Sequence, residues 1–129
     1  MTSLQQYALI ALGGALGSCA RYRLGSFIAG RWGTAFPWGT FAVNVTGSIL
    51  IGAFLALAGD RLHLDPRWRF FLAIGFCGGY TTFSTFTYET AMLLEARALG
   101  YAVANVALSS LAGILGVFGG AALARRLWL

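Results

Sequence analysis

The sequence contains no lysine and few charged side chains of either sign. Only 10% of its 129 residues are charged, against about 25% in soluble globular domains. Nine residues are basic, all of them arginine, four are acidic, and the mean hydropathy is +0.73. A chain this short cannot bury so much apolar surface in a water-soluble core. The scarcity of charge therefore excludes an ordinary soluble protein and indicates an integral membrane protein with the lipid bilayer as its partner.

Residue types that carry catalysis or bind metals are also scarce. Both cysteines, Cys19 and Cys77, fall in apolar runs, and the single histidine is His63. None of them has a metal-ligand spacing, and no nucleophile lies beside a base, which argues against an enzyme and against a redox or metal site built on these side chains. The net charge of +5 does not indicate nucleic acid as a partner, because the arginines flank apolar runs, where they anchor helices at lipid headgroups.

Four runs without a charged residue mark candidate membrane spans, at residues 4–20, 32–59, 70–88 and 98–124. A hydrocarbon core about 30 Å thick needs about 20 helical residues. The first run is shorter, and we extend it past Arg21 and Arg23, whose long side chains can snorkel. We predict an all-α integral membrane fold with four transmembrane helices, at residues 4–29, 38–58, 68–97 and 100–126. They form a single transmembrane domain over residues 1–129, multi-pass in the cell (inner or plasma) membrane.

The basic residues are divided almost evenly between the two sides of such a bundle. One side carries Arg61, Arg67, Arg69, Arg125 and Arg126. The other side carries Arg21, Arg23, Arg31 and Arg97. Orientation follows an excess of basic residues in short cytoplasmic loops, and five against four is almost no excess. We therefore predict dual topology, with two oppositely inserted copies paired about a two-fold axis in the membrane plane. The alternative is that one orientation dominates for a reason that this count does not capture.

The third predicted helix contains a segment that suits lipid poorly. Residues 75–88 read GFCGGYTTFSTFTY, in which two adjacent glycines precede a run of hydroxyl side chains. Glycine weakens a helix, and hydroxyls need partners that lipid does not supply. Irregular backbone at membrane depth occurs where it is buried in protein or lines a pathway. We predict a break at Gly78 and Gly79, in mid-span, and a buried pathway for something small.

Polar residues on the neighbouring helices recur along single faces. Thr40, Asn44 and Ser48 are spaced by four residues, and so are Asn105 and Ser109, which places each set on one helix face. One interpretation is that these groups only hydrogen-bond between helices, as polar residues in membrane bundles often do. The other is that they line the pathway, and we favour it for Asn44 because a mid-span amide needs a partner or water.

The chemistry of these side chains favours an anion. Phe83 and Phe86 lie one turn apart among hydroxyl residues that include Ser84 and Thr85. Hydroxyls, amides and the positive edges of phenyl rings suit an anion that accepts hydrogen bonds, whereas cation pathways more often present carboxylates or carbonyls. Arg21 would attract an anion to the mouth of the path. The nearby carboxylate Glu89 either has a function or pairs with an arginine.

Interrupting a helix also frees backbone carbonyls, which must find a partner. In a two-fold dimer, carbonyls from both copies could converge on the axis and hold a monovalent cation such as Na⁺. The alternative is that neighbouring hydroxyls satisfy the interrupted backbone, and the sequence leaves both possibilities open.

Three segments of the chain resemble, in order, the signature motifs of the Fluc (CrcB) fluoride ion channels. They read GGALGSCARY at residues 13–22, GTFAVNVTG at 39–47 and GFCGGYTTFSTF at 75–86. The resemblance covers essentially the whole chain. It implies an antiparallel homodimer with two pores, which passively exports fluoride and so lowers its concentration in the cytoplasm.

The resemblance also implies roles for individual residues. A structural Na⁺ at the dimer centre would be held by the backbone carbonyls of Gly78 and Thr81. The residues of the fluoride path would be Arg21 at the entrance, Asn44, the pore phenylalanines Phe83 and Phe86, and a polar track of Ser84, Thr85, Asn105 and Ser109. Some family members carry a tyrosine where this chain has Asn105 and a serine where it has Gly113, so the fourth-helix track differs here.

Two other membrane functions are compatible with a short four-helix chain. A proton-coupled exporter of the small multidrug resistance kind uses a carboxylate in its first helix, and residues 4–30 contain none. A purely structural membrane subunit is the third alternative, and it would leave the polar faces without a function.

Overall fold

The structure is built from helices throughout the part of the chain that it describes. The computed structural model describes residues 1–60 and 64–128, so Arg61 and His63 lie outside the described residues. Helix α1 covers Ser3–Trp32, α2 covers Trp38–Asp60 and α6 covers Leu99–Trp128. The third segment comprises α3 (Pro66–Trp68), the π-helix η1 (Arg69–Cys77), α4 (Gly78–Tyr80) and α5 (Phe83–Glu95). The prediction of an all-α fold is confirmed.

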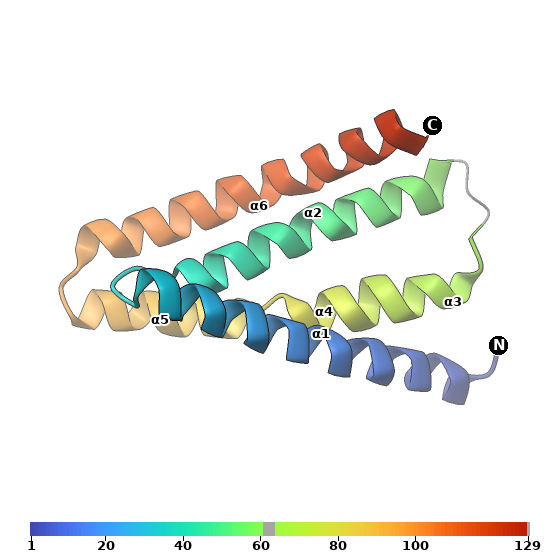
Figure 1. The fold of residues 1–129 in the computed structure, drawn as a ribbon, viewed down its shortest axis with the longest axis horizontal. Helices are drawn as coiled ribbons and strands as arrows, with labels where there is room; N and C mark the ends of the chain where they lie inside the picture. The colour runs from blue at the N-terminus through green and yellow to red at the C-terminus, as the bar shows by residue number, and fades with distance from the viewer. Residues whose placement is uncertain (61–63, 129) are drawn as a thin grey trace.

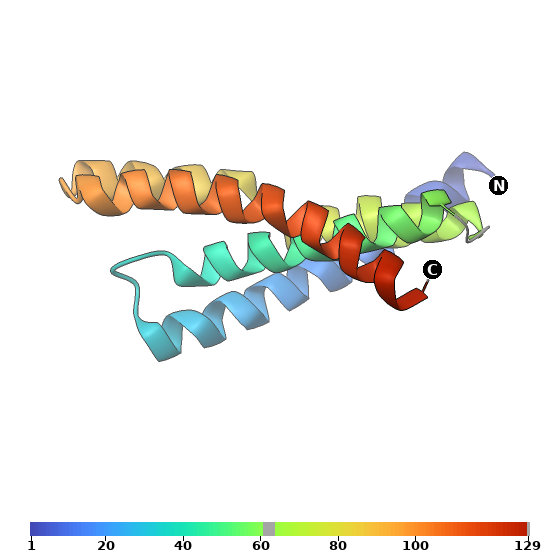
Figure 2. The same ribbon diagram turned by 90° about the horizontal axis from the view of Figure 1, so that it is seen from above.

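The helices run up and down along one long axis. The start of α1, the end of α2, the start of α3 and the end of α6 lie at one end, and the α1–α2 and α5–α6 connections lie at the other (Figure 1). Seen from above, α5 and α6 diverge from α1 and α2 toward the second end (Figure 2). Helix α2 packs mainly against α6, and α1 packs mainly against η1 and α4.

Two of these helices, α2 and α6, are long and apolar enough to cross a membrane. The spans Trp38–Gly59 and Leu99–Trp128 have mean hydropathies of 2.0 and 1.9, yet only 22% and 11% of their most apolar windows is buried within the chain. The whole structure exposes 8330 Å², about 1,700 Å² more than a compact soluble protein of this mass. Its apolar surface is therefore directed outward, as a bilayer environment requires.

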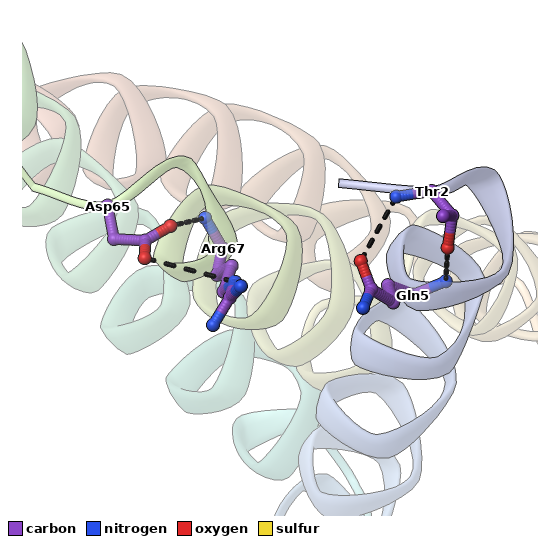
Figure 3. A network of polar contacts seen from close by, with 4 residues as sticks. All are labelled: Thr2, Gln5, Asp65 and Arg67. Atoms are coloured by element: carbon purple, nitrogen blue, oxygen red, sulfur yellow. Dashed lines mark hydrogen bonds and ion pairs between the residues drawn. The ribbon is translucent and has the colours of Figure 1, made fainter.

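Side chains near the N-termini of α1 and α3 cap these two helices (Figure 3). Thr2 Oγ1 accepts a hydrogen bond from the Gln5 backbone N–H at 3.3 Å, and Gln5 Oε1 accepts one from the Thr2 N–H at 3.0 Å. Asp65 Oδ1 accepts from the Arg67 N–H at 2.9 Å, directly before Pro66 in the first turn of α3. These side chains satisfy N–H groups that have no partner within a helix.

Glycine pairs bring α1 into backbone contact with the third segment. A Cβ atom at Gly13 would collide with the carbonyl oxygen of Phe71, and one at Gly17 with that of Phe76. From the opposite side, a Cβ at Gly79 would lie 2.5 Å from the Gly14 carbonyl oxygen. The helices approach this closely only because no side chain stands between them.

Glycines also bring α2 and α6 into backbone contact. A Cβ at Gly52 would collide with the Val117 carbonyl oxygen, and a Cβ at Gly120 with that of Ile49. Gly116 is also buried in this contact, with the Ile49 side chain 3.3 Å from its Cβ position. The two apolar helices therefore form a closely packed pair that acts as the scaffold for α5.

The α2–α6 contact predicts opposite outcomes for two adjacent glycines of α6. Gly120→Ala should lower the free energy of unfolding by about 1–3 kcal/mol, because the methyl group must push the Ile49 carbonyl away. Gly119→Ala meets nothing within 4 Å and should be neutral or stabilising by up to about 1 kcal/mol. Thermal unfolding in detergent, followed by tryptophan fluorescence, measures both, and equal melting temperatures for the two variants would contradict the contact.

Candidate functional site

The backbone between α4 and α5 is extended at two residues. Thr81 has φ −83° and ψ 156°, and Thr82 has φ −149° and ψ 119°. The extended residues thus follow the glycine pair that the sequence singled out, and Gly78 and Gly79 themselves remain helical in α4. Gly79 serves close packing, since it lies against the α1 backbone at Gly14, whereas a Cβ at Gly78 would meet nothing within 4 Å.

Asn44 of α2 pairs with the backbone of Thr82 through both ends of its amide. Asn44 Oδ1 accepts from the Thr82 N–H at 2.7 Å, and Asn44 Nδ2 donates to the Thr82 carbonyl at 3.0 Å. The side chain thus supplies the partners that the Thr82 N–H and carbonyl do not find within a helix. Nδ2 carries a second hydrogen, for which no acceptor exists among the described residues.

Hydroxyl groups organise the first turn of α5. Thr82 Oγ1 accepts from the Thr85 N–H at 3.2 Å, which makes Thr82 the N-cap of the helix. The same hydroxyl donates to Thr85 Oγ1 at 3.1 Å and lies 3.4 Å from Ser84 Oγ. A threonine N-cap followed by a helix is a readable sequence signal, yet Thr82 is not among the residues to which the sequence patterns assigned a role.

On one side of this interruption lies a cavity of about 570 Å³, here called the outer cavity. It is enclosed by α1, the α1–α2 connection, the start of α2 and one face of α5, and its lining includes Arg21, Thr40, Thr82, Thr85 and Glu89. Thr40 Oγ1 donates to Glu89 Oε1 at 2.9 Å, while Glu89 Oε2 is buried without a partner among the described residues. Arg21 lines the same cavity but forms no ion pair with Glu89.

On the other side lies a groove of about 410 Å³ between α2, the η1–α4 segment, α5 and α6, here called the hydroxyl groove. Its polar and aromatic lining consists of Asn44, Ser48, Thr81, Thr82, Phe83, Phe86, Ser109 and Ser110. The Phe83 and Phe86 rings are 5.8 Å apart between centroids and inclined at 41°. Thr82 lines both spaces, so the Asn44–Thr82 pair stands where the outer cavity and the hydroxyl groove meet.

The structure gathers most of the predicted path residues around these two spaces. Arg21 and Thr85 line the outer cavity, and Asn44, Phe83, Phe86 and Ser109 line the hydroxyl groove. Ser84 and Asn105 line neither space. Ser84 is exposed on the first turn of α5, whereas Asn105 is only 1% exposed and is enclosed between α5 and α6.

The two carbonyls expected to hold Na⁺ have no hydrogen-bond donor in the described part of the chain. In a continuous helix the Gly78 carbonyl would accept from the Thr82 N–H, which here bonds to Asn44. The Thr81 carbonyl would accept from the Thr85 N–H, which here bonds to Thr82 Oγ1. Free carbonyl oxygens are suitable ligands for a hard monovalent cation, so both residues fit that role by their chemistry.

Asn105 takes part in a chain of hydrogen bonds between α6 and α5. Its Nδ2 donates to Thr90 Oγ1 at 2.9 Å, and its Oδ1 accepts from Ser109 Oγ at 3.2 Å. Thr90 in turn donates to the Phe86 carbonyl at 2.8 Å. The hydroxyl proton of Ser109 is therefore committed to Asn105 in this structure, although Ser109 itself lines the groove.

Sequence comparison relates the chain to one family along nearly its whole length. The family described as CrcB-like protein, Camphor Resistance (CrcB), matches residues 8–121. A relative from Koribacter versatilis is 42% identical over 97% of this chain and 99% of its own length. Relatives from Solibacter usitatus and Nitrobacter winogradskyi are 48% and 50% identical over 94% and 84% of this chain, and 99% and 89% of their own lengths.

All three relatives bear the name fluoride-specific ion channel FluC. The family match includes the first two helices, the interrupted third segment and most of α6. From the extent of this match and the level of identity, the chain belongs to the CrcB family.

Proposed function

We propose that the chain forms a fluoride-selective ion channel that lets fluoride leave the cytoplasm passively across the cell membrane. The observation that carries the proposal is that the outer cavity and the hydroxyl groove share Thr82 and meet at its pair with Asn44. The name of the relatives, which describes an ion channel and not an enzyme, supports the same function. The proton-coupled exporter is disfavoured because residues 4–30 contain no carboxylate.

The lining of the route suits a small anion that is strongly hydrated. Such an ion gives up its water only where closely spaced donors replace it. Arg21 attracts the anion into the outer cavity, and the Thr85 hydroxyl and the second N–H of Asn44 are donors further along. The rings of Phe83 and Phe86 present positive edges at the groove, which has no carboxylate in its lining.

The route needs a second copy of the chain to close it. Phe83 is 77% exposed although it lines the hydroxyl groove, and the chain exposes about 1,700 Å² more than a compact protein of its mass. One partner of a standard protein–protein interface buries about 800 Å², so the excess on one chain is large enough for such a contact and for lipid-facing surface besides. We propose an antiparallel homodimer, each chain crossing the membrane four times, with two pores related by the two-fold axis.

The same assembly accounts for the free carbonyls of Gly78 and Thr81. One chain offers two oxygen atoms, too few for a monovalent cation, and an inverted second chain doubles the set. We propose that a structural Na⁺ occupies this position at the dimer centre, where it replaces the hydrogen bonds that the interrupted helix lacks.

The aromatic lining can be tested at Phe83. Phe83→Ile removes a ring edge from the groove and should reduce fluoride efflux from proteoliposomes at least about tenfold, equivalent to about 1.4 kcal/mol of barrier. Phe27→Ile is the matched control, because Phe27 is also exposed (57%) but lines neither space. A fluoride electrode measures the efflux, and unchanged efflux from intact F83I dimers would remove Phe83 from the path.

The pairing of Asn44 with Thr82 generates a second test. Asn44→Leu keeps the volume but leaves the Thr82 N–H and carbonyl without partners, so we expect a loss of about 1–3 kcal/mol in the free energy of unfolding. Fluoride efflux should fall at least about tenfold as well, because the junction of the two spaces is no longer held. Thermal unfolding and efflux are measured on the same preparation, and a fully stable N44L variant would show that the pairing is dispensable.

Dual topology can be tested by changing the charge balance. The double variant Arg31→Gln, Arg97→Asn leaves five basic residues on one side of the bundle and two on the other. It should therefore insert in one orientation and lose fluoride efflux. Asparagine is chosen at position 97 because it suits the left-handed backbone there (φ 58°). Arg67→Gln, Arg69→Gln and Arg126→Gln together bias insertion the other way. Each variant alone should be inactive, and co-expression should restore efflux. Full activity of a uniformly oriented variant would overturn the antiparallel dimer.

A further inference from the structure

Helix α5 carries Phe83 and Phe86 but is weakly tied to the rest of the chain. It is separated from α4 by the extended residues Thr81 and Thr82, and it packs mainly against α6. Between α5 and the other long helices, the described side chains form two hydrogen bonds, Thr40 to Glu89 and Asn105 to Thr90. The orientation of the phenylalanine rings therefore depends on a small number of polar contacts.

The contact at Asn105 is the better shielded of the two. Asn105 is 1% exposed and is the only buried polar side chain among the described residues. An amide so far from water is stable only when both of its ends are hydrogen-bonded. Thr90 and Ser109 satisfy those ends, at 2.9 and 3.2 Å.

The hydrogen bonds of Thr90, Asn105 and Ser109 have mutually consistent directions. Thr90 has one hydroxyl hydrogen and gives it to the Phe86 carbonyl, so its oxygen can only accept from Asn105. The amide nitrogen must therefore face Thr90, and the amide oxygen must face Ser109 and accept its proton. No other arrangement of the amide satisfies all three partners at once.

We propose that Asn105 is a positioning residue for the pore, which holds the Phe86 turn of α5 in register with Ser109 of α6, and does not itself line the fluoride path. This inference rests on the proposed channel function. It assigns to Asn105 a role different from the one that the resemblance implied, because the side chain is buried, lines neither space, and already uses its oxygen and one N–H in bonds to Ser109 and Thr90.

The consequence is that Thr90, which lines neither space, should matter as much as Asn105. Thr90→Val removes the acceptor for the amide while keeping the side-chain volume, and Thr90→Ser retains it. Thr87→Val is the matched control on the same helix, since Thr87 makes a comparable bond to the Ser84 carbonyl, at 3.0 Å, but has no link to α6.

Fluoride efflux per reconstituted dimer should fall about tenfold in T90V and in N105A, the effect of about one lost hydrogen bond. The double variant T90V/N105A should be no slower than the slower single variant, because both changes break the same link. T90S and T87V should keep efflux close to that of the unmodified chain. Efflux losses that multiply in the double variant would overturn the proposal.

A spectroscopic measurement separates positioning from general destabilisation. 4-Fluorophenylalanine placed at position 86 should show a shifted ¹⁹F resonance in T90V and N105A, and an unshifted one in T90S and T87V. This readout needs no fluoride transport, so it tests the hydrogen bond between Asn105 and Thr90 even if the unmodified chain does not conduct fluoride. A chain that does not conduct fluoride would refute the proposed function, but not the positioning role of Asn105. If N105A does not reconstitute, T90V and T90S carry the test, and an unshifted resonance in T90V would overturn the proposal.

Discussion

The arrangement of the site depends on one side chain acting as a backbone substitute. By engaging the N–H and the carbonyl of Thr82, Asn44 allows the third segment to leave the helical path at membrane depth, where unsatisfied backbone groups are costly. Two features follow from these hydrogen bonds between Asn44 and Thr82. The carbonyls of Gly78 and Thr81 lose their helical donors, and Thr82 becomes free to cap α5. The free carbonyls and the cap of α5 therefore follow from the pairing of Asn44 with Thr82, which stands where the hydroxyl groove and the outer cavity meet.

A rigid scaffold holds this pair in place. The glycines of α1 and α6 bring backbone against backbone, at Gly17 with Phe76 and at Gly120 with Ile49. In lipid there is no hydrophobic driving force between helices, so close packing and interhelical hydrogen bonds must supply the association. Glycine contacts hold the apolar halves of the bundle, while amides and hydroxyls hold α5. The polar contacts of α5, Thr40 with Glu89 and Asn105 with Thr90, tie it to α2 and α6, and Figure 2 shows α5 and α6 diverging from α1 and α2.

Much of this was readable from residue types and spacing, and some was not. The four-residue spacing of Thr40, Asn44 and Ser48 predicted a shared polar face, and Asn44 and Ser48 do line one groove. The glycine pair predicted irregular backbone at Gly78 and Gly79, but the extended residues are the two threonines that follow. Spacing identifies which residues share a face. It does not say that Asn44 will bond to a backbone 38 residues away, because that contact is decided by how α2 meets the third segment.

The sequence by itself determined the environment and the chemistry of this protein. Scarce charge and long apolar runs indicate lipid, and the abundance of hydroxyl, amide and phenyl groups favours an ion that accepts hydrogen bonds. Only the tertiary structure decided which of those groups line the two spaces and which hydrogen-bond between helices. Asn105 and Ser109 share one helix face in the sequence, yet one is enclosed between helices and the other lines the groove. The reason is that periodicity specifies direction around a single helix axis, whereas exposure depends on where the neighbouring helix lies.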